Sequence, residues 1–448
     1  MDLSPAALRT AYAKGGVTPV DVVGHVLSRL TDDDQESVWI STVDPEVALI
    51  SAEALTRRIA DLDNLPLFGL PFSVKDNIDV AGAPTTAACP AFQYVATESA
   101  FVVEQALKAG AIYIGKTNLD QFATGLVGVR SPYGTPCNPF NPDYIPGGSS
   151  SGAGVSISTG VVSFAFGTDT GGSGRVPASY NGIAGFKPAP GLLSRRGLVF
   201  ACRSIDTPSV FTKTATDACT VFDAVNAHDP LDAFATAPAI IKAQKSLPSH
   251  PKIAVPQKSD LQFFGNAEIE ALFEAATDHA RTLFGHVSEI DFTPFTDLND
   301  IMFFGPLLAE RDVSVGAFID GNFEAIDPTV RGLVQQSKQM SAADAYRAQY
   351  RVLDAKIATK SVWDQNDILM VPTVGTILTT AELLDDPLSP NFKNGFYTNY
   401  ANPLGLSAIA TPFKRTKSGV PWGVTLLVNH SNLNDLAAIA DAFSGSVS

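Results

Sequence analysis

The N-terminal part of the chain alternates apolar and polar stretches in a way that predicts helices joined to short buried strands. Helices are expected to begin at Ser4 and at Thr18, because each hydroxyl side chain precedes a proline, which suits the first helical position. Asp21 strengthens the second start. The pattern then predicts an apolar run over Leu67–Val74, a helix over Phe101–Lys108 closed by Gly110, a strand over Ala111–Ile114 and a helix capped by Asn118. Strand, helix and strand at this spacing indicate an α/β fold with a sheet covered by helices.

The rest of the chain divides into a glycine-rich centre and a more regular C-terminal half. Gly147–Gly174 is dense in glycine and serine but keeps apolar positions, which predicts close backbone packing with amide N–H groups left free. Residues 228–260 are richer in Pro, Ala and Lys and are expected to form a surface connection within a single domain, 1–448. A buried strand is expected at Ile368–Val371. Ser341 is expected to cap a long helix that carries an apolar face of Tyr346, Tyr350, Leu353 and Ile357.

Composition and charge narrow the class of protein. The 448 residues are 45% hydrophobic, which is enough to bury a large core and argues against disorder. The net charge of −15 (31 basic minus 46 acidic side chains) opposes binding to nucleic acid or to anionic membranes. The N-terminus lacks a basic and then apolar leader, and the uncharged stretch Tyr144–Thr168 is too rich in Ser and Gly to insert into a membrane. Four cysteines without CxxC spacing suit a reducing cytosol, so a cytoplasmic protein is expected.

Two short motifs match well-known patterns in the wrong context. Gly110–Thr117 fits the phosphate-binding P-loop pattern, but a helix precedes it and its interior is an apolar, strand-like run, so a helix end followed by a strand is expected. Gly148–Gly152 fits the nucleophile elbow of Ser-His-Asp esterases with Ser150 at its centre. Prolines interrupt the approach to that elbow, and none of the six histidines lies in a motif, so an esterase remains only a remote alternative.

Three other segments carry a consistent chemical pattern. Lys75 lies in Gly69–Asn77, and the other two segments place Ser149 after two glycines and Ser173 near the end of Gly167–Arg175. Together they resemble the amidase signature family, whose catalysis rests on a Ser-cisSer-Lys triad. The resemblance implies the amidase signature fold, a large mixed β-sheet covered on both faces by helices, and a cis peptide between Gly148 and Ser149.

The resemblance is narrower over most of the chain, where it points to the allophanate hydrolase branch of that family. The segments that carry it are Thr117–Gly125, Arg130–Gly134, Ala201–Asp206, Gly305–Arg311, Asn394–Asn399 and Gly419–Thr425. Two departures are visible. A C-terminal domain usual in that branch is expected to be absent, and Phe303 stands where the branch usually has a substrate-contacting tyrosine.

The resemblance implies roles for individual residues. Ser173 is the expected nucleophile, Ser149 its proton relay and Lys75 the base. The oxyanion hole is expected to consist of the backbone N–H groups of Thr170, Gly171, Gly172 and Ser173. To act as a base, Lys75 needs its pKa lowered from about 10.4 toward roughly 7, which takes about 4 to 5 kcal/mol of burial and hydrogen bonding. The adjacent Asp76 would oppose this if it faced the ammonium, so it is expected to point elsewhere. No metal or organic cofactor is required.

Substrate choice follows from the same branch. The expected reaction is release of ammonia from the terminal amide of allophanate, a small anion, with Gly125, Phe303 and Arg311 as the substrate-binding residues. Arg311 offers a planar fork suited to a carboxylate. Because Phe303 removes a hydroxyl donor, a related amide acid such as malonamate, or a biuret-like amide, stays open. The catalytic subunit of a tRNA-dependent amidotransferase is a further alternative. A homodimer is expected, together with a separate protein that supplies the missing C-terminal function.

Overall fold

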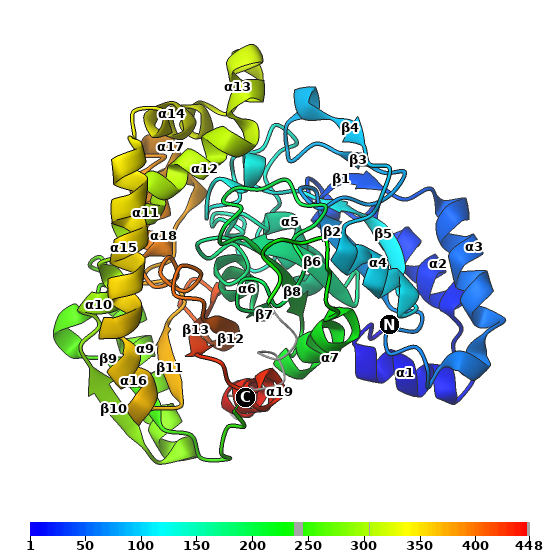
Figure 1. Ribbon diagram of the computed structural model, residues 1–448. Helices are drawn as coiled ribbons and strands as arrows, with labels where there is room; N and C mark the ends of the chain where they lie inside the picture. Colours follow the sequence, from blue (N-terminus) through cyan, green and yellow to red (C-terminus); the bar gives the residue numbers. More distant parts are fainter. Residues whose placement is uncertain (237–244, 304, 446–448) are drawn as a thin grey trace.

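The computed structural model describes residues 1–236, 245–303 and 305–445, apart from the side chains of Asp33 and Phe303. Their main feature is an 11-stranded mixed sheet (Figure 1). Its strands, in spatial order, are β1 (Trp39–Thr42), β5 (Ile112–Thr117), β2 (Pro71–Lys75), β6 (Phe164–Asp169), β8 (Thr207–Thr212), β7 (Ala184–Lys187), β12 (Ser407–Arg415), β13 (Pro421–Val428), β11 (Ile368–Pro372), β9 (Ile253–Pro256) and β10 (Val287–Ile290). A separate two-stranded sheet joins β3 (Pro84–Thr85) to β4 (Tyr94–Val95).

Strand direction changes across the large sheet. Strand β2 runs parallel to both of its neighbours, β5 and β6, whereas β8, β7, β12, β13 and β11 pair antiparallel. The sheet ends in a parallel group, β11, β9 and β10. The expected mixed sheet is therefore confirmed, and β2 lies inside it, paired on both sides and fully buried.

Helices cover both faces of this sheet. On one face α5 (Ser151–Ser158) packs against α6 (Val176–Asn181), and on the other α4 (Phe101–Lys108), α7 (Ala215–Val225), α19 (Leu433–Gly445) and α9 (Ala267–Phe284) contact one another in turn. Strand β7 shows the two sides directly. The α-carbon of Gly185 faces Ala178 of α6, while the next side chain, Phe186, packs edge-on against Phe222 of α7. Successive residues of a strand point to opposite faces, so the two helical layers lie on opposite sides.

The remaining helices extend the two edges of the molecule. They are α1 (Pro5–Ala13), α2 (Pro19–Arg29), α3 (Pro45–Thr56), α10 (Thr293–Thr296), α11 (Asn299–Phe303), α12 (Ala309–Arg311), α13 (Ala317–Gly321), α14 (Pro328–Ser337), α15 (Ala342–Ala358), α16 (Lys360–Gln365), α17 (Thr380–Asp385) and α18 (Ser389–Gly395). In Figure 1 the helices from α10 to α15 form one side of the molecule, and α1 to α3 lie at the opposite edge.

Local sequence signals account for most element boundaries. At Thr18 the predicted helix start is confirmed by a capping box in which the hydroxyl accepts from the Asp21 amide, a device that contributes about 1 kcal/mol. The α4 boundaries match the prediction. Asn118 does not cap a helix, and that expectation is wrong. Its side-chain amide instead donates to the carbonyls of Ser37 and Gly134, and so pins two loops together.

The long helix α15 begins at the predicted Ser341 cap, but its apolar face does not enter the core. Tyr346, Tyr350, Leu353 and Ile357 are all more than half exposed, while Ala348 and Ala355 form the buried side. Residues 228–260 were expected to form a surface connection, but a strand near their C-terminal end is buried. Ile253–Pro256 is the buried strand β9, while residues 237–244 lie outside the described part of the chain.

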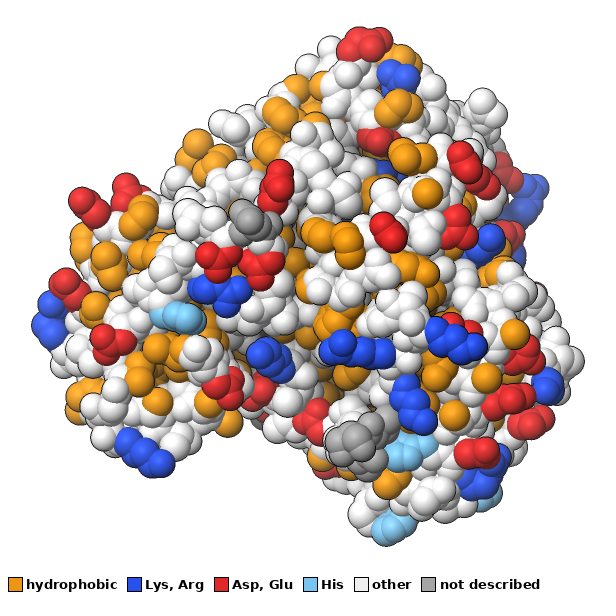
Figure 2. All heavy atoms as spheres, turned by 180° about the vertical axis from the view of Figure 1, so that it is seen from behind, with side chains coloured by type: hydrophobic (Ala, Val, Ile, Leu, Met, Phe, Trp, Pro, Cys, Tyr) orange, Lys and Arg blue, Asp and Glu red, His pale blue; other side chains and the backbone are white. Residues whose placement is uncertain are grey.

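The core lies between the sheet and its helices. Phe72 of β2 stacks on Phe164 of β6 with ring centroids 5.0 Å apart, and both side chains are fully buried, a gain of about 2 to 3 kcal/mol each. No helix in the described residues is long and apolar enough to cross a membrane. Figure 2 shows basic, acidic and hydrophobic side chains interspersed over the rear face.

Candidate active site

Strand β2 places the side chain of Lys75 on the face of the sheet that α5 covers. Ser73 and Lys75 are two residues apart, so they share a face, and the Ser73 hydroxyl lies 3.2 Å from that of Ser156 in α5. The Lys75 Nζ donates to Ser149 Oγ and to Thr168 Oγ1, both at 2.8 Å. Both Lys75 and Ser149 are completely buried.

Burial changes the acid–base character of Lys75. Loss of hydration lowers the pKa of Lys75 to about 7, although the charges of Asp120, Asp206 and Asp169 act in the opposite direction. Thr168 Oγ1 also accepts from the Asn77 amide, at 3.3 Å, so the hydroxyl is held in place by a second donor. A lysine in this condition is neutral for part of the time at neutral pH and can accept a proton.

Asp76 points away from Lys75, as expected. One of its carboxylate oxygens accepts from Lys116 Nζ at 2.9 Å in an ion pair with both side chains fully buried. The other oxygen accepts from the backbone N–H of Thr86 at 2.9 Å and from the Thr86 hydroxyl. Lys116 balances the charge of this carboxylate, so Asp76 does not stabilise the protonated form of Lys75.

The loop before α5 presents Ser149. The peptide between Gly148 and Ser149 is cis, as the resemblance implies. The carbonyl of Ser149 accepts from the Asp120 amide at 3.0 Å, and the Asp120 carboxylate accepts in turn from the backbone N–H groups of Val127, Gly128 and Arg130. These bonds hold the Ser149 loop and the 125–130 loop in one fixed arrangement.

Ser173 lies on a turn, Thr170–Ser173, which is held in place by the buried ion pair between Asp169 and Arg175. The Asp169 carboxylate accepts from Arg175 at 2.8 and 3.0 Å and from the amides of Gly172 and Gly174. Burial alone would raise the pKa of Asp169, but Arg175 and the amide donors hold it below its ordinary value. Ser173 is almost fully buried, and no hydrogen bond joins it to Ser149 within the described residues.

This geometry changes the predicted oxyanion hole. The N–H of Gly172 belongs to the predicted hole, but that group already donates to Asp169 Oδ1 at 3.0 Å. In the described part of the chain the amides of Thr170, Gly171 and Ser173 have no such partner and remain available. The Thr170 hydroxyl donates to Asp206 at 2.6 Å, which fixes the start of the turn.

Arg311 is the predicted substrate-binding residue whose surroundings are most informative. It is 4% exposed, its Nε donates to Thr124 Oγ1 at 3.2 Å, and its Nη1 is buried without a hydrogen-bond partner among the described residues. The neighbouring Glu310 does not pair with it, because Glu310 accepts from the backbone and hydroxyl of Ser204. A buried guanidinium with a free edge is a strong attraction for an anion.

Thr124 and Arg130, which were not among the expected site residues, hold Arg311 in place. The Thr124 carbonyl accepts from Arg130 Nη1 at 3.0 Å while the Thr124 hydroxyl accepts from Arg311, so Thr124 links the two arginines. Gly125 follows directly, and a Cβ on it would lie 3.1 Å from Arg130 Nη1. Thr124 and Arg130 lie in segments that resemble the family, which was the available signal. The side chain of Phe303 lies outside the described residues.

The two misleading motifs are also explained. Most of Gly110–Thr117 is strand β5, and its lysine, Lys116, is the partner of Asp76, so the stretch is a helix end followed by a strand as expected. Ser150 donates to the Thr168 carbonyl at 3.2 Å rather than to a histidine.

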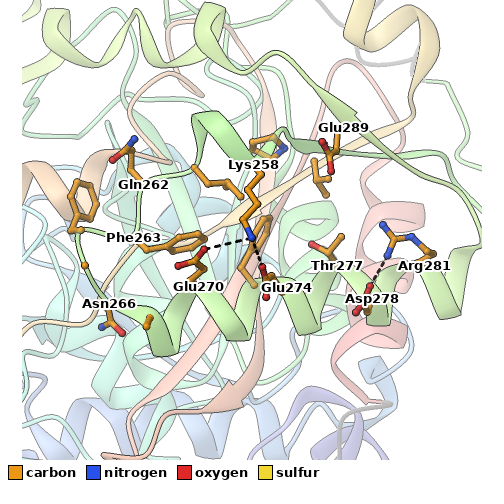
Figure 3. A pocket seen from close by; sticks show the side chains of 17 residues that line it. Lys258, Gln262, Phe263, Asn266, Glu270, Glu274, Thr277, Asp278, Arg281 and Glu289 are labelled. Atoms are coloured by element: carbon orange, nitrogen blue, oxygen red, sulfur yellow. Dashed lines mark hydrogen bonds and ion pairs between the residues drawn. The ribbon is translucent and has the colours of Figure 1, made fainter.

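A surface pocket lies away from this site. It has a volume of about 600 Å³ and lies against α9, and none of the predicted site residues lines it. Its charged side chains largely pair with each other (Figure 3): Lys258 reaches Glu270 and Glu274, and Arg281 reaches Asp278.

Comparison with known proteins agrees with this arrangement. A family model described as Amidase matches residues 21–432. A urea amidolyase from Saccharomyces cerevisiae is 38% identical over 395 residues, which are 88% of this chain and 21% of that protein. The chain thus spans about a fifth of the length of that relative. A solved structure of Kluyveromyces lactis allophanate hydrolase superimposes with a TM-score of 0.91 at 34% identity, covering 99% of this chain and 72% of that one.

A more distant group is similar over its full length. A glutamyl-tRNA(Gln) amidotransferase subunit from Desulforapulum autotrophicum is 28% identical over 460 residues, 95% of this chain and 93% of that protein. Fold and family together define an amide-cleaving hydrolase, and its candidate site holds a buried lysine bonded to a serine. The chain belongs to the amidase family. Within that family, its similarity to allophanate hydrolase and urea amidolyase exceeds its similarity to the amidotransferase.

Proposed function

We propose that this protein hydrolyses the terminal amide of allophanate and releases ammonia, as a step of urea degradation. The single observation that carries the amidase chemistry is the buried Lys75, bonded to Ser149 and with its pKa lowered to about 7 by burial. The observation that favours an acid substrate is Arg311, buried with Nη1 unpaired. The relatives named for allophanate and urea chemistry add support.

The proposed mechanism begins with Lys75 in its neutral form. Lys75 Nζ takes the hydroxyl proton of Ser149, Ser149 takes that of Ser173, and Ser173 Oγ attacks the amide carbon. The relay requires a hydrogen bond from Ser173 to Ser149 in the substrate complex. The negative charge that develops on the carbonyl oxygen is met by the free amides of Thr170, Gly171 and Ser173.

The intermediate then collapses. Its C–N bond breaks, the leaving nitrogen receives the proton back through Ser149, and ammonia departs from an acyl-enzyme on Ser173. Water attacks the acyl carbon while Lys75 again accepts a proton through Ser149. As the bond to Ser173 breaks, that proton returns from Lys75 through Ser149 to Ser173 Oγ, which restores the hydroxyl and the neutral lysine. Arg311 holds the substrate carboxylate throughout, which offsets the repulsion expected from a chain of net charge −15.

The decisive test is an assay of purified protein with a panel of small amides. Ammonia release from allophanate, malonamate and biuret is measured for the wild type and for Ser173→Ala. Allophanate is expected to give the highest kcat/KM, with loss of activity in the variant. If malonamate is the better substrate, the alternative amide-acid function holds instead.

We also propose that the protein is cytoplasmic and homodimeric. The sparse cysteines and the resemblance support these points. Measurement of the solution mass by light scattering tests the dimer, and a mass of about 47 kDa would refute it.

A further inference from the structure

Asn399 carries two buried polar atoms without a hydrogen-bond partner among the described residues. It is 0% exposed, and neither Oδ1 nor Nδ2 has a partner, whereas every other side chain of the described residues with an unpaired buried polar atom has only one. Because both atoms are unpaired, exchanging the oxygen and nitrogen of the amide does not resolve the deficit. Burying an unpaired amide costs about 1 to 3 kcal/mol in proteins, so such groups normally meet a water or a ligand.

Asn399 lies beside the Thr170–Ser173 turn. Its Oδ1 lies 2.8 Å from where a Cβ on Gly171 would be, so the amide lies directly against the turn that carries the available oxyanion donors. Met302 of α11 bounds the same space, at 3.1 Å from that point. Any side chain larger than hydrogen at position 171 would press against Asn399 and Met302, so glycine is needed for this close approach.

The backbone around Asn399 is held rigidly. The hydroxyl of the preceding Thr398 donates to the carbonyl of Gly171 at 2.6 Å, and the carbonyl of Thr398 accepts from Arg175 at 3.0 Å. Arg175 in turn is the ion-pair partner of Asp169, which holds the turn. Asn399 is therefore fixed to the same scaffold as Ser173, and its unpaired amide is not the result of a loose loop.

Arg311 is linked to the same turn through Asp206. It interacts electrostatically with Asp206, whose carboxylate accepts from the Thr170 hydroxyl. Arg311 and Asn399 are thus both linked to the turn, one through Asp206 and Thr170 and the other at Gly171. In the proposed complex, a small substrate is bound through its carboxylate to Arg311 with its carbonyl on the turn, and its central atoms lie near Asn399.

The chemistry of the proposed substrate leaves one group without a partner. Arg311 binds the carboxylate, the amides of the turn receive the carbonyl oxygen, and the terminal NH₂ leaves as ammonia. The imino N–H between the two carbonyl carbons remains. This N–H and the adjacent carboxylate oxygen form a planar donor–acceptor edge, which an amide side chain matches with its own oxygen and NH₂.

We propose that Asn399 is a specificity-determining residue that pairs with this edge, with Oδ1 accepting from the imino N–H and Nδ2 donating to the carboxylate oxygen. The inference rests on the proposed function, because it takes allophanate as the substrate. Asn399 would distinguish allophanate from malonamate, which has a CH₂ in place of the imino N–H and so leaves Oδ1 unpaired.

The test compares Asn399→Leu with the wild type on both substrates. Leucine has a similar volume and no polar atoms, so kcat/KM for allophanate is expected to fall at least about tenfold, while that for malonamate falls several-fold less or rises. The ratio of the two values therefore shifts toward malonamate. Asn434→Leu, on the exposed surface of α19, is the matched control and is expected to leave both values unchanged.

Stability separates this role from a structural one. Because the Asn399 amide has no protein partner, Asn399→Leu is expected to keep or raise the urea midpoint of unfolding. Asn399→Ala is the second variant, and it should show the same shift in substrate ratio. An unchanged ratio in both variants, or a loss of stability with equal loss on both substrates, overturns the inference even when the wild type hydrolyses allophanate. A wild type inactive on allophanate refutes the proposed function and the inference together.

Discussion

Lys75 Nζ donates to Ser149 Oγ across 2.8 Å, and neither residue is exposed to solvent. The contact joins the C-terminal end of a central strand to the residue that follows a cis peptide, 74 positions along the chain. Removing a lysine from water disfavours its charge, which suits the role of base that we propose for Lys75. Ser149, Ser173 and the free amides of the Thr170–Ser173 turn are the groups that we propose as its relay, its nucleophile and the site that receives the negative charge.

The serine roles can be separated by substitution within one segment. Ser173→Ala and Ser149→Ala should each lower kcat by about a thousandfold or more, because each removes a member of the proton relay. Ser150→Ala is the matched control, since among the described residues the partner of the Ser150 hydroxyl is the carbonyl of Thr168. It should change kcat little and reduce stability by about 1 kcal/mol. A loss in Ser150→Ala as large as that in Ser149→Ala would contradict the assignment.

Activity should rise with pH through the pKa of Lys75. Burial lowers that pKa to about 7, so below this pH the lysine is protonated and cannot accept a proton, and above it the neutral base predominates. A plot of kcat/KM is expected to climb with a midpoint near pH 7 and then level off. Lys75→Arg, which stays charged, should be inactive over the whole range. A wild-type profile that is flat from about pH 5.5 to about pH 9 would be inconsistent with this base.

Arg311 should matter for charged substrates alone. Arg311→Met removes the free guanidinium edge, so KM for allophanate or malonamate is expected to increase about 10- to 100-fold. A neutral small amide should be hydrolysed at an unchanged rate. The exposed Arg347, which pairs with Asp344, provides the control Arg347→Met with no expected effect. Equal losses on neutral and anionic amides would show that Arg311 supports the fold rather than the substrate.

The ion pair between Lys116 and Asp76 should be essential for stability. Lys116→Met leaves a fully buried carboxylate unpaired, which is expected to lower the free energy of unfolding by about 3 to 5 kcal/mol. Lys360→Met breaks the exposed pair with Asp364 and should change it by no more than about 1 kcal/mol. Urea titrations of the two variants measure the difference. Similar small losses in both would mean that Asp76 finds another partner.

Much of the fold was predictable because its signals are local. Capping at Thr18 and Ser341, the α4 boundaries and the buried strand at Ile368 depend on a few neighbouring residues, and the structure confirms them. Asn118 shows where local reasoning fails. The same side chain that can cap a helix can also tie two loops together, and only the approach of Ser37 and Gly134 decides between them.

The motifs in the sequence were enough to predict the family and the residues proposed for catalysis: a lysine, two serines and a glycine-rich turn, with Asp76 expected to face away from the lysine. The hydrogen-bond partners and the burial of these groups became visible only in the folded chain. Tertiary structure assigned the Gly172 amide to Asp169 instead of the oxyanion hole, left Arg311 and Asn399 buried with free polar atoms, and exposed the apolar face of α15. Sequence specifies which groups a side chain carries, whereas burial and hydrogen-bond partners depend on segments hundreds of residues apart, such as 171 and 398.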